Sequence, residues 1–272
     1  MAAKLTPFRL VQAGQPTAAR APDWTNPITR GLELLWHGGD RGDRNSAQRS
    51  GATASGSGIA TRVYPQGVAR AFDGSATYLS WPTNELSTNH DFTIFMVMRS
   101  HDVPPPRHRL FHVGVRSAGA GGVLTLSDWY GGSTLSYEKI SVGQYNSGVE
   151  CPLNVPCVVA LTYNATSGDL VFTARNLLTG AVATDTQNNS SAHSGNSGEV
   201  GLSQSSADSG NCAIFMSAFW WRTLAKLEIE SLIAAPWQLF AKRQIMLPRQ
   251  VAAASSSPLG MFDADLRIAA WF

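Results

Sequence analysis

The sequence predicts an all-β chain: an antiparallel β-sandwich with one late helix and an extended arm at each end. Short apolar segments recur between Gly, Pro and Asn turn residues along most of the 272 residues. One of them, residues 91–98, is apolar on both faces, as a strand at the centre of a packed sheet must be. Hydrophobic residues make up 43% of the chain and charged residues 15%, which is enough apolar material for a core and too little charge for a disordered chain.

The predicted strands are short, and turn residues separate them. They lie at residues 31–36, 68–72, 77–81, 91–98, 110–115, 123–126, 135–137, 139–142, 156–163, 170–175, 181–184, 199–202 and 212–221. In the segment 91–98, the even-numbered apolar residues fall on one face, and Phe95 and Val97 fall on the other. Two polar stretches, 37–60 and 186–197, are predicted as loops because Gly, Ser, Arg and Asn dominate them.

One segment late in the chain has helical periodicity. Ile229, Leu232 and Ile233 have the spacing of one helix face and predict a helix over residues 224–235. Thr223 is the expected N-cap residue, and the proline that follows the segment should end the helix.

The two ends of the chain lack periodicity. Residues 1–30 and 241–272 are predicted as extended arms around a domain at residues 31–240, which includes the helix. The second arm ends on an apolar stretch, residues 266–272, which holds Leu266, Ile268, Trp271 and Phe272. Left exposed, they would favour aggregation, so we expect them to dock on their own domain or on a neighbouring subunit.

The composition argues against several classes of protein. The formal net charge of +2 gives no bulk attraction to nucleic acid or to an anionic membrane. No stretch approaches the roughly 20 apolar residues of a membrane-spanning helix, and the N-terminus lacks the apolar run of a signal peptide. The odd number of cysteines (Cys151, Cys157 and Cys212) favours reduced thiols, although the first two could pair across a turn.

Several segments resemble the laminin-G/concanavalin-A-like domains of bacteriophages and prophages. The segment from Asn26 to Trp36 resembles their opening strand, and Phe72-Asp-Gly-Ser-Ala-Thr-Tyr78 resembles their Phe-x-Gly-x-x-x-Tyr strand pair. The segment from Phe219 to Phe240, with its Pro-Trp-Gln-Leu-Phe ending, resembles the closing strand and helix. The resemblance covers about residues 26–243, a plausible span for one domain. It implies a lectin-like jelly roll associated with a virion.

No catalytic constellation is apparent. The chain lacks the Glu-x-Asp-x-Glu run of a glycosidase strand and the Gly-x-Ser-x-Gly turn of a hydrolase, so we expect no enzyme. His101, His108 and His112 lie near prolines in strand and loop segments, which favours a basic loop over a metal site. We expect no cofactor, with calcium as an open alternative. Its candidate ligands are Asp73, Asp128, Asp169 and Asp208.

The favoured function is a non-enzymatic structural protein of a phage virion, on the head or tail surface. Its arms would anchor it to other virion proteins and to copies of itself. The alternative is a module of a tail fibre or tail tip that binds a host-surface glycan through loops 37–60, 127–133 and 186–197. For that function Asp128, Trp129 and Tyr130 are the candidate ligand-binding residues, since a flat aromatic beside polar groups can stack on a sugar. The competing interpretation of Trp129 is a half-buried hairpin aromatic.

Overall fold

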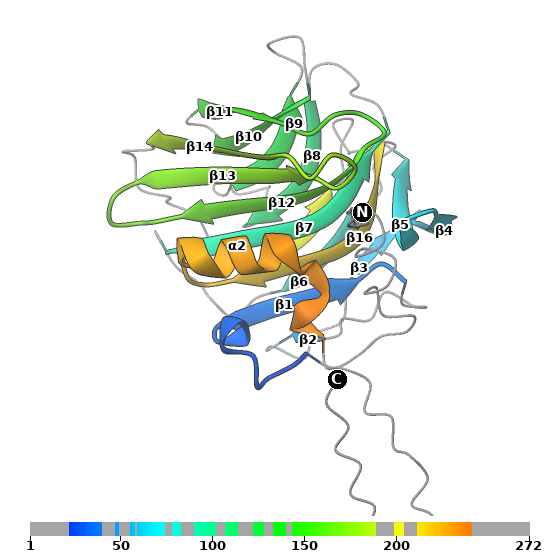
Figure 1. The fold of residues 1–272 in the computed structure, drawn as a ribbon, viewed down its shortest axis with the longest axis horizontal. Helices are drawn as coiled ribbons and strands as arrows, with labels where there is room; N and C mark the ends of the chain where they lie inside the picture. Colours follow the sequence, from blue (N-terminus) through cyan, green and yellow to red (C-terminus); the bar gives the residue numbers. More distant parts are fainter. Residues whose placement is uncertain are drawn as a thin grey trace, which may run out of the picture. The chain divides into compact units, whose positions relative to one another are not determined.

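The structure is a computed structural model in which two antiparallel β-sheets pack face to face and a helix covers one of them (Figure 1). It describes residues 22–39, 47–48, 55–57, 59–73, 78–82, 90–101, 107–113, 122–127, 133–139, 143–188, 199–203 and 211–240. The predicted antiparallel β-sandwich is confirmed. None of the helices in these ranges is long and apolar enough to cross a membrane.

The first sheet holds the central strand. Its main path runs β14 (Val182–Asn188), β13 (Asp169–Asn176), β12 (Pro156–Tyr163), β7 (Phe92–Ser100), β16 (Asn211–Trp220), β1 (Leu32–His37) and β2 (Ala47–Gln48). A branch adds β5 (Gly67–Asp73) beside β16, and β4 (Ala60–Tyr64) beside β5. The strand β7 pairs along its length with β12 and β16, which is the central position that its two apolar faces predict.

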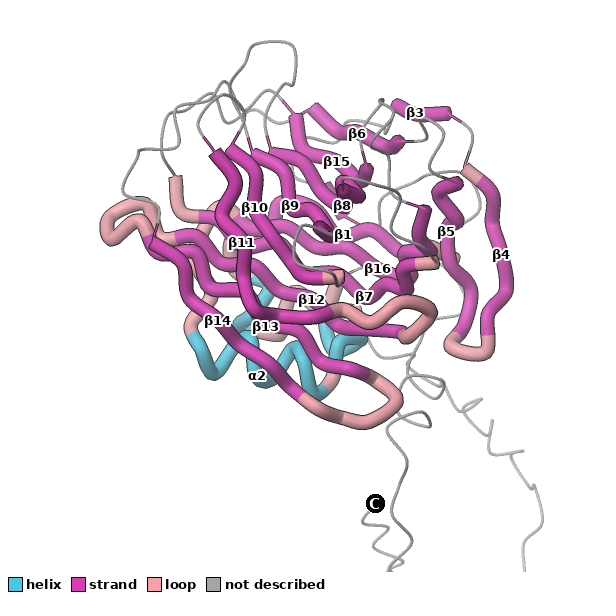
Figure 2. Tube along the Cα trace, turned by 90° about the horizontal axis from the view of Figure 1, so that it is seen from above, coloured by secondary structure: helices cyan, strands magenta, loops and turns pink. Residues whose placement is uncertain are grey.

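The second sheet runs in the order β11 (Gly143–Glu150), β10 (Thr134–Lys139), β9 (Gly122–Ser127), β8 (Arg107–Val113), β15 (Glu199–Ser203), β6 (Tyr78–Pro82) and β3 (Ser55–Ser57). Viewed from above, its strand β11 lies beside β14 of the first sheet (Figure 2). The Asp185 carboxylate of β14 accepts a hydrogen bond from the Gly148 backbone N–H of β11 at 3.0 Å. This bond joins the two sheets at one edge.

The main core lies between the sheets and is rich in aromatic rings. Phe219 of β16 stacks on Phe92 and Phe111, with ring centroids 6.2 and 5.7 Å apart. Phe92 also contacts Tyr137 and Tyr163, at 5.8 and 5.2 Å. Because such rings gain from both burial and mutual geometry, this cluster is a main source of cohesion between the sheets.

A second core lies on the outer face of the first sheet, beneath α2 (Lys226–Ala234) and the 3₁₀ turns η1 (Pro27–Thr29) and η3 (Pro236–Leu239). Ile229, Leu232 and Ile233 of α2 are buried there, together with Phe95 and Val97 of β7. The other face of β7 contributes to the core between the sheets. Both apolar faces of β7 are therefore used, one in each core.

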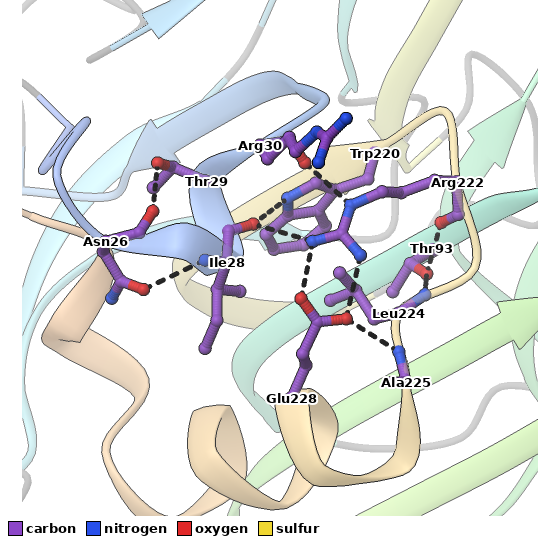
Figure 3. A network of polar contacts seen from close by, with 10 residues as sticks. All are labelled: Asn26, Ile28, Thr29, Arg30, Thr93, Trp220, Arg222, Leu224, Ala225 and Glu228. Carbon is purple, nitrogen blue, oxygen red and sulfur yellow. Dashed lines mark hydrogen bonds and ion pairs between the residues drawn. The ribbon is translucent and has the colours of Figure 1, made fainter.

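Arg222, just after β16, connects the start of the described chain to α2 (Figure 3). Its guanidinium makes two hydrogen bonds of 2.8 Å to the Glu228 carboxylate. It also donates to the backbone oxygens of Arg30 at 2.7 Å and Ile28 at 3.2 Å. Charge-assisted bonds with this fork geometry are among the strongest polar contacts in proteins. One side chain thus holds three separate segments together.

The helix begins two residues later than predicted, so Thr223 as its N-cap was wrong. The Thr223 hydroxyl donates instead to the Tyr163 backbone oxygen at 2.7 Å. Ala225 is the N-cap residue, and its N–H is satisfied by the Glu228 carboxylate at 2.8 Å. A carboxylate in the first turn also interacts favourably with the helix dipole. A side chain inside the helix therefore provides the cap.

The remaining differences concern strands with little apolar patterning. Residues 135–139 belong to one strand, β10, where the sequence predicted two short strands. The strands β4 and β11 lie outside the predicted segments, β2 and β3 fall within the predicted loop 37–60, and β14 extends into the predicted loop 186–197. β4 and β14 are largely exposed edge strands, so their sequences need no alternation of apolar and polar residues.

Part of the predicted N-terminal arm packs on the sandwich. Pro22 bridges to Phe240, and the Asp23 N–H donates to the Leu239 oxygen at 2.7 Å. Ile28 is buried, and its backbone oxygen accepts a hydrogen bond from the Trp220 indole N–H at 2.9 Å. The sandwich therefore includes residues from 22 onward. The other limits of the predicted arms lie outside the described residues.

Candidate functional site

The predicted ligand-binding residues, Asp128, Trp129 and Tyr130, lie outside the described residues. They belong to the connection between β9 and β10, whose flanking residues Ser127 and Thr134 are paired. The predicted docking residues, Leu266, Ile268, Trp271 and Phe272, also lie outside the described residues. What the structure does describe are two surfaces on the outer sides of the sandwich.

The first surface is the outer face of the second sheet, where strand register aligns two rows of mostly polar residues. One row crosses the strands from β6 to β11 through Ser80, Gly201, His112, Val123, Glu138 and Gln144. The other crosses from β8 to β11 through Arg109, Thr125, Ser136 and Asn146. Alternate neighbours such as Leu79, Phe111 and Tyr137 point into the core, so the rows lie on the opposite face. These ten residues are called the polar face below.

Polar contacts link the strands of the polar face. The Arg109 guanidinium lies 3.7 Å from the Glu138 carboxylate, which joins β8 to β10 across β9. The Gln144 amide donates to the Ser136 hydroxyl at 2.9 Å, which joins β11 to β10. The Oδ1 atom of Asn146 is buried and accepts no hydrogen bond. An unsatisfied buried acceptor is costly and marks a place where a donor would be favourable.

His112 and Gly201 are packed against each other on the polar face. A Cβ atom at position 201 would lie 2.3 Å from the Leu79 backbone oxygen and 2.4 Å from the His112 ring. Only glycine leaves room for this imidazole above the neighbouring strand. The His112 ring therefore occupies the space that a side chain at position 201 would need.

Accessibility differs along the polar face. Ser80, Arg109 and His112 are buried, whereas Glu138, Gln144 and Asn146 on β10 and β11 are partly exposed. A ligand can therefore reach the β10–β11 side most readily. The buried residues nearer β6 are less accessible to a ligand.

The second surface is a groove of about 870 Å³ on the first sheet, called the α2 groove below. Its walls are α2 and the outer face of β12, β13 and β14. Apolar side chains and threonine hydroxyls line most of it, and its charged residues are Arg175, Lys226 and Glu230. Its volume lies in the usual range for ligand sites.

The described residues do not assemble a metal site. Among them, no three His, Cys, Asp or Glu side chains come together. Two hydrogen bonds, from Ser167 of the preceding turn and from Asn188 of the neighbouring strand β14, hold the pKa of Asp169 below its ordinary value, so this calcium candidate already has donors as partners. Asp128 and Asp208 lie outside the described residues. The His101 ring stacks on Tyr64, with centroids 5.7 Å apart.

The three cysteines, Cys151, Cys157 and Cys212, are buried free thiols. Burial raises the pKa of Cys212 to about 12. A thiol with so high a pKa carries almost no thiolate at neutral pH and is a poor nucleophile.

Comparison with known proteins shows the fold and no family. No protein-family model matches the sequence, and no curated protein matches it. Among solved structures, the binding domain of botulinum neurotoxin DC in complex with SialylT superposes with a TM-score of 0.53 at 13% identity, over 76% of this chain and 52% of that chain. A mutant of the Trypanosoma rangeli sialidase that displays trans-sialidase activity superposes with a TM-score of 0.56 at 13% identity, over 87% of this chain and 38% of that chain.

Tailspike protein 2 of the Escherichia coli O157:H7 bacteriophage CAB120 gives a TM-score of 0.51 at 12% identity, over 69% of this chain and 27% of that chain. The chain thus spans about half or less of each of these three structures. At such identities the likeness shows a lectin-like β-sandwich and nothing finer. Structures with this fold include binding domains, an enzyme and a phage tailspike.

The polar face was missed by sequence reasoning. Its residues are spread from position 80 to position 201, and each occupies an ordinary alternating place in its strand. The signal that was available is the polar residue between apolar ones in Leu79-Ser-Trp81 and Leu135-Ser-Tyr137. The register that aligns these residues is not visible in one sequence.

Proposed function

We propose that this chain is a non-enzymatic carbohydrate-binding β-sandwich whose ligand lies across the polar face. The supporting observation is the alignment of polar side chains in two neighbouring rows, with partly exposed members at β10 and β11. The predicted residues Asp128, Trp129 and Tyr130 belong to the β9–β10 connection of the same sheet, so they would extend this surface. Proteins of similar fold include a neurotoxin binding domain solved with SialylT.

The chemistry of the polar face suits a sugar. The amides of Gln144 and Asn146 can both donate to and accept from sugar hydroxyls, and the Glu138 carboxylate can accept from them. The unsatisfied Asn146 oxygen would accept from a hydroxyl. Trp129 would supply the flat apolar ring on which the carbon face of a pyranose stacks.

The polar face also favours binding over hydrolysis. Glycoside hydrolysis needs two carboxyl groups that flank one bond. The two rows contain a single carboxylate, Glu138, and Arg109 lies against it. The likeness to a sialidase is therefore a likeness of fold and is no argument for an active site on the polar face.

The binding proposal is tested with the full chain on a glycan array, followed by calorimetry on the strongest binder. We expect Gln144→Ala and Trp129→Ala each to weaken binding about tenfold, because each removes a group that would contact the sugar. Lys226→Ala, on the first sheet, is the control and should bind like the wild type. Absence of any binder, or equal affinity in all variants, would reject the proposal. Release of free sugar from the bound glycan would reject its non-enzymatic part.

We further propose that the chain belongs to a phage virion, where its flanking arms contact other subunits. Support comes from the resemblance of residues 26–243 to phage domains and from the likeness to the CAB120 tailspike. Antibodies against the chain should label intact particles from a lysed producing host, as seen by electron microscopy. Label confined to the particle-free fraction would contradict this placement.

A further inference from the structure

The α2 groove has no described segment across it and lies on the first sheet, away from the polar face. Val171 and Val182 form part of its sheet side, and Ile229 and Ile233 form part of its helix side. Val182 is 57% exposed, which is unusual for an apolar residue beside other apolar residues. The groove therefore offers an open apolar surface rather than a filled core.

The charges at the groove are two cations and one anion, from Arg175, Lys226 and Glu230. Arg175 donates one hydrogen bond to the Ile233 backbone oxygen at 3.0 Å. Its Nε atom is buried and donates to no acceptor. A fitting ligand thus combines apolar side chains with more negative than positive charge, including an acceptor for this guanidinium.

The chain itself contains a segment with that pattern, Asp263-Ala-Asp-Leu-Arg-Ile268, followed by Ala-Ala-Trp-Phe272. In an extended conformation Leu266 and Ile268 share one face, while Asp263, Asp265 and Arg267 share the other. Two anions and one cation complement the two cations and one anion of the groove. With the apolar face against the groove, the two aspartates face away from its floor and would meet only long side chains that reach past the segment, such as those of Arg175 and Lys226.

The length of chain before this segment points to a different molecule as its receptor. α2 ends at Ala234 and η3 at Leu239, so a segment that followed them directly could return to this groove within a few residues. Instead, 22 residues (241–262) precede Asp263. Fully extended, that connection reaches about 70 Å. Surplus length lowers the effective concentration for a nearby site and suits a site on a neighbouring copy.

We propose that the α2 groove binds the segment Asp263–Phe272 of a second copy of this chain. The apolar residues of the segment would cover Val182 and its neighbours, and an aspartate would accept from the Arg175 guanidinium. Each copy would offer one groove and one segment, which is a head-to-tail contact able to extend an array or close a ring.

The test is a cysteine cross-link between two full-length single variants, Val182→Cys and Ile268→Cys, mixed and oxidised. The native cysteines are buried, so the introduced thiols should react selectively. We expect a reducible dimer of the two variants, formed at least fivefold faster than with Leu227→Cys in place of Val182→Cys. Leu227 lies on α2, the helix that forms one side of the groove, and is 77% exposed, but it is not part of the groove.

Equal rates for Val182→Cys and Leu227→Cys, or no dimer in either mixture, would overturn the proposal. A chain that carries both Val182→Cys and Ile268→Cys tests the alternative receptor. If it closes only an internal disulfide and stays monomeric at high concentration, the segment occupies its own groove and the second-copy proposal fails. Because no glycan is involved, these outcomes are independent of the carbohydrate-binding proposal.

Discussion

Arg222→Met is expected to lower the free energy of unfolding by about 3 kcal/mol, because it removes a charged donor that joins three segments. Glu228 loses both of its 2.8 Å bonds to the guanidinium, and the Arg30 backbone oxygen loses its 2.7 Å donor. The Ile28 oxygen keeps the Trp220 indole as a donor, so the loss falls mainly on α2. Urea denaturation of the full chain, followed by tryptophan fluorescence, measures the change.

The control for this variant is Lys226→Met, which removes the exposed i,i+4 pair with Glu230, 3.9 Å apart. An exposed pair of this kind contributes little, so a change below about 0.5 kcal/mol is expected. Equal losses in Arg222→Met and Lys226→Met would mean that the Arg222 network does not hold α2. The Arg222–Glu228 pair is partly buried, whereas the Lys226–Glu230 pair is exposed. Comparing the two variants therefore separates the contribution of the partly buried network from that of an exposed ion pair.

The same network predicts a dependence on pH. Hydrogen bonds from Arg222 hold the pKa of Glu228 below its ordinary value of 4.5, which the unfolded chain retains. The stabilisation is therefore complete above that value and is lost as the pH falls through the lower pKa of the folded state. In Arg222→Met the loss of stability over this acidic range should be smaller than in the wild type. A steeper loss in the variant would contradict the assignment.

Gly201→Ala is expected to destabilise the chain by about 2 kcal/mol, since its new methyl group would overlap two neighbours. The Cβ atom would lie 2.3 Å from the Leu79 backbone oxygen, which is fixed by strand pairing, and 2.4 Å from the His112 ring. The ring must shift, and the polar face would be disturbed where β15 meets β8. We therefore expect weaker glycan binding together with a lower unfolding midpoint.

Gly148→Ala provides the matched control on the same sheet. No atom lies within 4 Å of a Cβ at this position, and the backbone N–H that bonds Asp185 is retained. Replacing glycine by alanine without strain reduces the entropy of the unfolded chain, so a neutral or slightly stabilising effect is expected. If Gly201→Ala and Gly148→Ala behave alike in denaturation and in binding, close packing at Gly201 has no consequence.

The fold class could be predicted because burial leaves a strong pattern in the central strands. The two apolar faces of β7 follow from Phe95 and Val97 alternating with even-numbered apolar residues, and the structure uses both faces. The prediction ended the edge strand β14 too early, because Asp185, Thr186 and Gln187, which follow Thr184, carry no apolar signal. The helix start was misplaced because Thr223 satisfies a distant backbone oxygen instead of the helix.

The candidate site was harder to predict than the fold. Glu138 and Arg109 are 29 positions apart in sequence, and only the pairing of β8, β9 and β10 brings them within 3.7 Å. Gly201 has no side chain that could mark it in the sequence, yet its lack of a Cβ atom makes room for the His112 ring. The residues that sequence reasoning selected, Asp128, Trp129 and Tyr130, lie outside the described residues, so their role stays a prediction.

The contact between Pro22 and Phe240 sets where the sandwich joins the rest of the polypeptide. Chain entry and chain exit are adjacent, as in domains that tolerate insertion into a loop of a host protein. The unit could therefore be inserted between two neighbouring residues of a carrier protein without distorting the carrier or the sandwich. For the same reason, tension applied through the two flanking segments would separate this short pairing first and leave the sheets unloaded until it opened.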